Sequence, residues 1–370
     1  MAHAIRYSHE TPMSLLLSPT TLGPLSLQNR MAMSPMTRSR AIGNIPNALM
    51  ATYYGQRSSA GLIITEGVAP SPNGLGYARI PGLYSEAQVD GWKLVTAAAH
   101  AGGAKIIAQL MHTGRVSHPL NMPAGARVLA PSAVAAAGQM WTDQSQMQDL
   151  PVPEAMSAAD VASAVQEYAA ASRNAIAAGF DGVELHGANG YLIEQFIRPN
   201  ANRRTDAYGG SIERRARFVM EIVDAVSFAI GKDKVGIRLS PYGVFNDMPL
   251  YDAMEEDYIY LAEQLGARQI LYVHVLDHSG GGAPPVPDAI KATFRQHFPD
   301  NLILAGGYGA ERAEADLVAG KADVTTFGMT FLANPDLPAR FRSGAALNAP
   351  DVTTLYTPGE KGYTDYPALG

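Results

Sequence analysis

The chain has 370 residues, of which 47% are hydrophobic and 17% charged, so it can bury a large core. It contains no cysteine, which excludes disulfides, iron–sulfur clusters and a cysteine nucleophile. The net charge is −6 without a block of lysines or arginines, so a basic footprint for nucleic acid is missing. The segment Met1 to Glu10 has no apolar core, and Leu15 to Leu17 is too short to span a membrane. We therefore expect a soluble, cytoplasmic protein.

Short runs rich in valine and isoleucine alternate with alanine-rich stretches along the chain. A hairpin turn is expected at Leu22 to Leu25, before the first run. The runs are continuously apolar, which is typical of parallel strands covered on both faces. They span Arg30 to Ser34, Leu62 to Thr65, Lys105 to Leu110, Gly182 to Leu185, Val235 to Leu239, Ile270 to Val275, Leu302 to Ala305 and Asp323 to Phe327. Helices are expected over Ala87 to Ala101, Ala158 to Ala178, Ile212 to Ile230 and Tyr251 to Leu265.

Strand and helix units in this number predict an α/β fold, a closed (β/α)8 TIM barrel rather than an open doubly wound sheet. No Gly-x-Gly-x-x-Gly opens a helix after a strand, which disfavours a Rossmann domain. Residues 112–156, after the third strand, show little periodicity, and a connection of this length is normally functional, so we expect a lid. No linker or repeat marks a second domain, and residues 1–370 are predicted to form a single barrel domain.

The fourth predicted strand leads into a group of polar side chains. His186, Asn189 and Tyr191 place an imidazole, a carboxamide and a phenol within six residues. In a (β/α)8 barrel the active site gathers where strands meet their following loops. Neutral donors beside a proton donor suit a substrate that develops negative charge on oxygen. The segment therefore predicts polarisation of a carbonyl and protonation of a neighbouring carbon, although polar glycine-rich loops after strands are common in other settings too.

The strand ends also carry two clues to a cofactor. Gly306 to Gly309 and Phe327 to Met329 follow the seventh and eighth strands, where barrels often bind phosphate through backbone N–H groups. Tight turns need glycine as well, so both interpretations stand. Arg238 lies inside an apolar strand and needs an anionic or strongly accepting partner. That partner is either a bound ligand or a carboxylate such as Glu184 or Glu66.

Other catalytic chemistries find little support in the sequence. His274, Asp277 and His278 are of ligand type, but their spacing matches no known metal site, and no metal is expected. His274 is better explained as a hydrogen-bonded strand histidine, and His112 and His118 as solvated loop histidines. A Gly-x-Ser-x-Gly elbow for serine catalysis is absent.

From about Leu22 to Pro367 the chain resembles the Old Yellow Enzyme family of flavin-dependent ene reductases. Thr37 stands where a related branch of that family has cysteine, so the resemblance is to the threonine-type branch. The resemblance rests on many ordered motifs. They are Asn29-Arg30 with Ser34 to Arg38, Gln109-Leu110 with His112 to Arg115, His186 to Tyr191 with Gln195-Phe196, Arg204 to Ser211, Gly236 to Ser240, Ala333 to Leu337 and Gly362 to Pro367.

The resemblance implies non-covalent FMN at the mouth of the barrel, reduction by NAD(P)H, and hydride transfer to the β-carbon of an activated alkene. It implies that His186 and Asn189 hold the carbonyl or nitro oxygen of the substrate, while Tyr191 protonates the α-carbon. Arg238 is expected near flavin N1 and O2, and Gln109 at the pyrimidine edge. The other implied cofactor-binding residues are Pro35, Met36, Thr37 (to flavin O4), Gly67, Gly307, Tyr308, Gly328 and Met329. Tyr77, Met111 and Tyr356 are implied in the substrate cavity, where aromatic packing under a lid also explains the two tyrosines.

Two positions depart from the family pattern. Met329 stands where relatives often have an arginine on the FMN phosphate, and loss of a charge-assisted bond costs ~1.5–3 kcal/mol. We therefore expect FMN to be held more loosely. Met111 stands where many relatives have tryptophan, and a flexible thioether predicts a differently shaped, roomier cavity.

Alternatives to an NADH- or NADPH-dependent ene reductase remain at this stage. One is a flavin-free barrel isomerase or aldolase acting on a phosphorylated substrate, and another is a flavoprotein that binds ligands with little turnover. Enones, maleimides, nitroalkenes and nitrate esters would all suit the site, and Arg115 and Arg127 are candidate contacts for a coenzyme 2′-phosphate. Neither nucleic acid nor membrane is an expected partner, and the sequence leaves monomer and dimer open.

Overall fold

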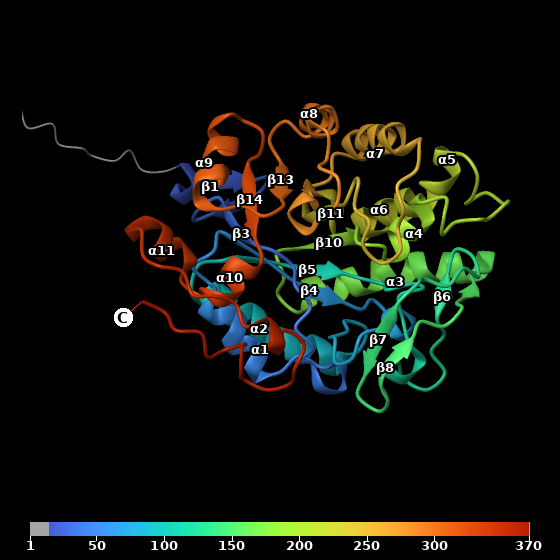
Figure 1. Cartoon of the computed structure of the whole chain (residues 1–370), viewed down its shortest axis with the longest axis horizontal. Helices are drawn as coiled ribbons and strands as arrows, with labels where there is room; N and C mark the ends of the chain where they lie inside the picture. The colour runs from blue at the N-terminus through green and yellow to red at the C-terminus, as the bar shows by residue number, and fades with distance from the viewer. Residues whose placement is uncertain (1–14, 370) are drawn as a thin grey trace, which may run out of the picture.

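The computed structural model describes residues 15–369, so the predicted features of Met1 to Glu10 lie outside the described residues. A closed barrel of parallel strands forms its centre (Figure 1). The strands follow one another around the barrel in chain order, and β14 pairs with β3 to close it. They are β3 (Met31–Met33), β4 (Leu62–Val68), β5 (Lys105–Leu110), β10 (Gly182–Gly187), β11 (Val235–Leu239), β12 (Tyr272–Leu276), β13 (Leu302–Ala305) and β14 (Val324–Phe327). The predicted strands and the TIM-barrel fold are confirmed.

Helices lie around the barrel and separate consecutive strands (Figure 1). The helix predicted from Ile212 is divided at Ala216, and the one predicted from Tyr251 begins instead at Met254. The described helices are α1 (Ala48–Gln56), α2 (Glu86–Ala101), α3 (Ala158–Ala177), α4 (Leu192–Ile197), α5 (Ile212–Arg215), α6 (Arg217–Ile230), α7 (Met254–Arg268), α8 (Asp288–His297), α9 (Ala310–Val318), α10 (Met329–Ala333) and α11 (Leu337–Ser343). Among the described residues, no helix is both long and apolar enough to cross a membrane.

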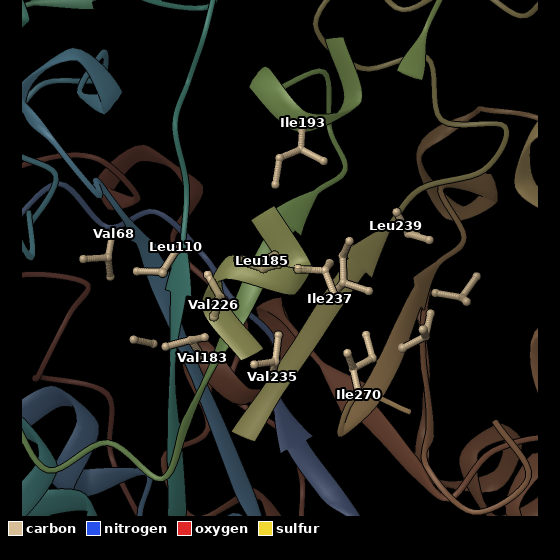
Figure 2. Close-up of a cluster of buried hydrophobic side chains, with 14 of the residues drawn as sticks. Val68, Leu110, Val183, Leu185, Ile193, Val226, Val235, Ile237, Leu239 and Ile270 are labelled. Atoms are coloured by element: carbon tan, nitrogen blue, oxygen red, sulfur yellow. The ribbon is translucent and has the colours of Figure 1, made fainter. Parts of the chain in front are cut away.

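The apolar side chains of the strands pack outward against the helices. Figure 2 shows Val183 and Leu185 of β10 beside Val235 and Ile237 of β11, with Val226 of α6 next to them in the same buried cluster. Because successive side chains of a strand point to opposite faces, the residues between these apolar positions point into the barrel.

The amino-terminal end of the barrel is closed by apolar side chains. The predicted hairpin is present as β1 (Thr20–Leu22) paired antiparallel with β2 (Leu25–Leu27). Its leucines form one buried cluster with inward-facing residues of the barrel such as Leu62 and Ile107. Gly23, in the turn, has φ +54° and no room for a Cβ, which would lie 2.5 Å from Leu271 Cδ1. With this end filled by apolar groups, a polar site belongs at the opposite, carboxyl end of the strands.

The long segment between β5 and α3 has more regular structure than its sequence predicts. It contains β6 (Leu129–Ala130), β7 (Gln139–Thr142), β8 (Gln146–Asp149) and β9 (Glu154–Ala155). β7 and β8 form an antiparallel hairpin, which we call the lid hairpin, and β6 pairs with β9. Strands of two to four residues are too short to show a recognisable alternation of apolar and polar residues in the sequence.

Candidate active site

A cavity of about 460 Å³ lies at the carboxyl end of the barrel strands. Its lining comes from the ends of β3, β4, β5, β10 and β11, from α10, from the lid hairpin and from the carboxyl-terminal loop. The volume is within the range of small-molecule sites. Most of the residues predicted from the sequence line it: Pro35, Met36, Thr37, Gly67, Tyr77, Gln109, Met111, His186, Asn189, Tyr191, Arg238, Met329 and Tyr356.

Three predicted cofactor residues do not line this cavity, namely Gly307, Tyr308 and Gly328. Gly328 directly precedes Met329, which does. The Tyr308 side chain points elsewhere, because its hydroxyl donates to Asp316 (2.8 Å) and its ring lies under the Arg312 guanidinium. At Gly307, with φ +62°, an added Cβ would meet no atom within 4 Å, so space is open beside this backbone. Any contact of Gly307 and Tyr308 with a ligand would therefore use their main chain.

His186 is buried and neutral. Burial holds the pKa of its imidazole well below the usual value, and the charges of Arg238 and His274 lower this pKa further. The backbone N–H of Ala188 donates to His186 Nδ1 at 3.3 Å, so the ring proton belongs on Nε2. A neutral imidazole with the proton on Nε2 can donate a hydrogen bond to an oxygen in the cavity.

Asn189 is held from three sides in a left-handed conformation (φ +59°). Its N–H donates to Ser240 Oγ at 3.0 Å, and its carbonyl oxygen accepts from Asn246 Nδ2 at 2.8 Å. Its side-chain Oδ1 lies 2.7 Å from Nε2 of His278, a residue that was not predicted at this site. With a proton on Nε2, His278 donates to Oδ1, which leaves the amide N–H groups of Asn189 free to donate to another oxygen.

Tyr191 is buried beside His186, with the two rings perpendicular and their centroids 4.7 Å apart. Its hydroxyl donates to the Tyr77 hydroxyl at 3.0 Å. Burial and the neighbouring Tyr77 raise the pKa of Tyr191 well above the usual value. The phenol therefore carries its proton at neutral pH and can act only as an acid.

Arg238 makes neither of the two ion pairs considered from the sequence. Its side chain is buried, its Nε has no hydrogen-bond partner, and burial lowers its pKa. Glu184 instead accepts from Tyr272 (3.0 Å), from His274 Nδ1 (2.9 Å) and from Gln109 Nε2 (2.7 Å). Arg238 is thus left with donors for a ligand, and Gln109 with its side-chain oxygen as an acceptor.

The remaining histidines partly differ from expectation. His274 is a hydrogen-bonded strand histidine at Nδ1, but its buried Nε2 has no partner. His112 was expected to be solvated, which is wrong, because the residue is buried and only 1% exposed. Burial lowers the pKa of His112 to about 3, and its Nδ1 accepts from the Gly114 N–H. No group of histidine and acidic residues suited to hold a metal ion is found between residues 15 and 369.

Met111 is packed into the cavity wall and is 1% exposed. A Cβ at Gly67 would lie 2.5 Å from the Met111 sulfur, so the glycine at the end of β4 makes room for the thioether. Gly67 thus allows Met111 to pack into the wall, and the expectation of a roomier cavity stays a prediction.

The mouth of the cavity contains residues that the sequence analysis did not identify. Arg79, which has φ +54°, donates to Ser39 O (2.9 Å) and Tyr356 O (2.8 Å) and pairs with Asp143. It thereby ties the loop after β3 and the carboxyl-terminal loop to the lid hairpin. Trp141 of the hairpin also lines the mouth. Their sequence signal is weak, since they lie far apart in the chain, Arg79 in an irregular segment and Trp141 in a strand of four residues.

The two arginines proposed for a coenzyme phosphate do not line the cavity. Arg115 is 1% exposed and donates to the carbonyl oxygens of Ala135 and Asp247, so the expectation for Arg115 is wrong. Arg127 is exposed and pairs with Glu154 and Asp160.

Comparison with known proteins supports one family over almost the whole chain. A family model described as the NADH:flavin oxidoreductase / NADH oxidase family matches residues 15–348. A probable flavin mononucleotide-dependent alkene reductase of Leishmania infantum is 44% identical over 360 residues, covering 96% of this chain and 98% of the relative. The structure of morphinone reductase in complex with tetrahydroNAD is 45% identical with a TM-score of 0.91, covering 96% of this chain and 98% of that one. The Old Yellow Enzyme homologue of Zymomonas mobilis is 38% identical with a TM-score of 0.90, covering 96% and 99%.

Proposed function

Since the chain belongs to the NADH:flavin oxidoreductase / NADH oxidase family, we propose that it reduces the C=C bond of activated alkenes with FMN and NAD(P)H. The resemblance to the Old Yellow Enzyme family is confirmed by this membership. One observation of the cavity carries the proposal: the neutral donors of His186 and Asn189 lie beside a buried phenol that can act only as an acid. This set suits an alkene whose electron-withdrawing oxygen gains charge during reduction.

The residues of the cavity fit FMN. Arg238 offers a buried, unpartnered donor, and Gln109 offers an acceptor oxygen that its bond to Glu184 leaves unused. These two would hold the polar edge of the flavin ring. Open space beside the backbone of Gly307 would admit the phosphate. Because α9 begins just after Gly309, the backbone N–H groups of its first turn would also be available to the phosphate. Met329 adds no charge there.

Bound FMN would take hydride from NAD(P)H and deliver it to the β-carbon of the alkene. His186 Nε2–H and the Asn189 amide would donate to the carbonyl or nitro oxygen and stabilise the charge that develops on it. Tyr191 would give its proton to the α-carbon, completing the saturated product. The Tyr77 hydroxyl, 3.0 Å from that of Tyr191, would orient the phenol.

The proposed substrates are α,β-unsaturated carbonyl compounds, maleimides and nitroalkenes. The lid hairpin lines the same cavity as the barrel strands, which supports a single catalytic domain. Either coenzyme would deliver its hydride in this cavity, and the test below compares NADH with NADPH.

A rapid-mixing experiment tests the proposal. The purified protein should carry the visible absorbance of flavin, lose it on anaerobic reaction with NADH or NADPH, and regain it on mixing with 2-cyclohexenone or N-methylmaleimide. A colourless protein that binds no FMN would favour the flavin-free isomerase or aldolase. Flavin reduction without reoxidation by any activated alkene would favour a ligand-binding flavoprotein.

A further inference from the structure

A second cavity of about 740 Å³ adjoins the mouth of the active-site cavity. We call it the outer cavity, and the active-site cavity the inner one. The residues that line both come from the loop after β4, the lid hairpin and the carboxyl-terminal loop. They are Arg79, Trp141, Met147 and Tyr356. Beyond them the outer cavity is lined by Ile42, Asp143, Val352, Thr353, Thr357 and Pro358. The two cavities are therefore neighbours that share these four residues as part of their walls.

The walls of the outer cavity expose large apolar side chains. Ile42, Val352 and Tyr356 are 62%, 64% and 60% exposed, and Trp141 is 47% exposed. A single exposed apolar residue is ordinary, but several that face one cavity are typical of a binding surface. An apolar occupant would remove this surface from water.

The charged groups where the two cavities meet are already paired. The guanidinium of Arg79 donates to two backbone oxygens and pairs with Asp143, whose Oδ1 also accepts from Trp141 Nε1 (3.1 Å). These partners hold the pKa of Asp143 below its usual range. A charged ligand group would have to displace one of them and would gain little in exchange.

We propose that the outer cavity binds an uncharged alkyl or aryl group of the substrate, joined to the activated alkene that the inner cavity holds. This inference rests on the proposed function. It narrows the substrate class to activated alkenes with an apolar substituent several carbon atoms long. Small enones would fill only the inner cavity and would leave the outer apolar surface in water.

The adenosine end of the coenzyme is the rival occupant. It is joined to the nicotinamide by a pyrophosphate, which would carry negative charge past the residues that the two cavities share. There it would meet the carboxylate of Asp143, while the nearby guanidinium of Arg79 is engaged. An uncharged substituent meets no such cost, so the charges favour the substrate.

The test compares ligands that differ only in an apolar tail, on the FMN-loaded enzyme. Calorimetry gives the dissociation constants of N-methyl- and N-hexylsuccinimide, and steady-state kinetics gives kcat/KM for the corresponding maleimides. The chain has no cysteine for the maleimides to alkylate. Ile42→Glu and Val352→Glu each place a carboxylate in the outer cavity at an exposed position. Val318→Glu on α9 is the matched control, since Val318 is 69% exposed and lines neither cavity.

In the wild type and in Val318→Glu, the hexyl compound should bind at least about tenfold tighter than the methyl compound, the factor expected for burying about two methylene groups. In Ile42→Glu and Val352→Glu this ratio should fall toward one. An equal ratio in all four proteins overturns the inference, and so does a change confined to the KM of NADH. If the succinimide ratio behaves as expected but no maleimide is reduced, the outer cavity stands and the proposed function fails.

Discussion

The wall of the inner cavity and the mouth of that cavity differ in the elements that form them. We call the first, made of barrel strand residues, the inner wall. In the wall, Glu184, His186 and Arg238 lie on neighbouring strands, where barrel side chains hydrogen-bond Glu184 and burial keeps His186 neutral. At the mouth, exposed apolar side chains such as Trp141 lie on the lid hairpin and on loops that Arg79 ties together. We infer from this contrast that the barrel residues carry the chemistry of the proposed reaction and that the loops carry the choice of substrate. Changes in the wall should therefore slow every substrate, and changes at the mouth should re-rank substrates.

The largest effect is expected in the wall from Tyr191→Phe. Loss of the general acid should slow alkene reduction by about 10²–10⁴-fold, while reduction of the flavin by NADH continues. Rapid mixing measures the two half-reactions separately. Tyr84→Phe is the control, because Tyr84 packs against the same apolar cluster but does not line the cavity. Unchanged alkene reduction in Tyr191→Phe would show that the proton comes from elsewhere.

A smaller loss is expected from Asn189→Ala, which removes one donor to the substrate oxygen. Alkene reduction should fall about 10²–10³-fold. His278→Ala should cost less, because it removes only the group that orients the Asn189 amide at 2.7 Å. The double variant should be no slower than Asn189→Ala alone, which a double-mutant cycle on kcat/KM measures. Additive losses would mean that His278 acts independently of Asn189.

Met329→Arg should tighten binding of FMN by about one to two orders of magnitude, since it supplies a charge-assisted hydrogen bond at the phosphate end. Titration of the apoprotein with FMN, followed by quenching of flavin fluorescence, measures the dissociation constant. Met329→Leu is the control that changes the side chain without adding charge. Equal affinity of wild type and Met329→Arg would show that main-chain amides already satisfy the phosphate.

The smallest effect is expected from pH. The pKa of His186 lies well below its usual value and that of Tyr191 well above. His186 therefore stays neutral as the pH falls through about 6.5, and Tyr191 stays protonated as it rises toward about 10. The rate of alkene reduction by the reduced enzyme should change less than about twofold between about pH 6 and about pH 9. A steep loss below about pH 7 would show that the imidazole takes up a proton in this range.

The inner wall was largely predictable from the sequence. His186 to Tyr191 are contiguous and follow an apolar strand, and Arg238 stands out because a charge inside such a strand needs a partner. The sequence could not show whether Arg238 pairs with a carboxylate of the barrel or stays free for a ligand. Gln109, Tyr272 and His274 converge on Glu184 only through barrel closure, which leaves Arg238 unpaired.

The mouth was not predictable, for physical reasons. Arg79 adopts a left-handed backbone conformation that its residue type does not signal, and its partners lie about 40 to 280 residues away in the chain. Trp141 lies in a strand of four residues, too short for a periodic pattern. The outward direction of the Tyr308 side chain follows from its bond to Asp316 on α9, which no local pattern indicates.

The central claim is that hydride from the flavin and the proton of Tyr191 are added, within one cavity, to the β-carbon and the α-carbon of an activated alkene. The most direct measurement is reduction of 2-methyl-2-cyclohexenone with NADH deuterated at the transferred position, and separately in D2O, with the product analysed by NMR. The account predicts coenzyme deuterium at the β-carbon, solvent deuterium at the α-carbon, and an intact carbonyl. Deuterium at the carbonyl carbon of an alcohol product, or consumption of NADH without any deuterated organic product, would contradict it.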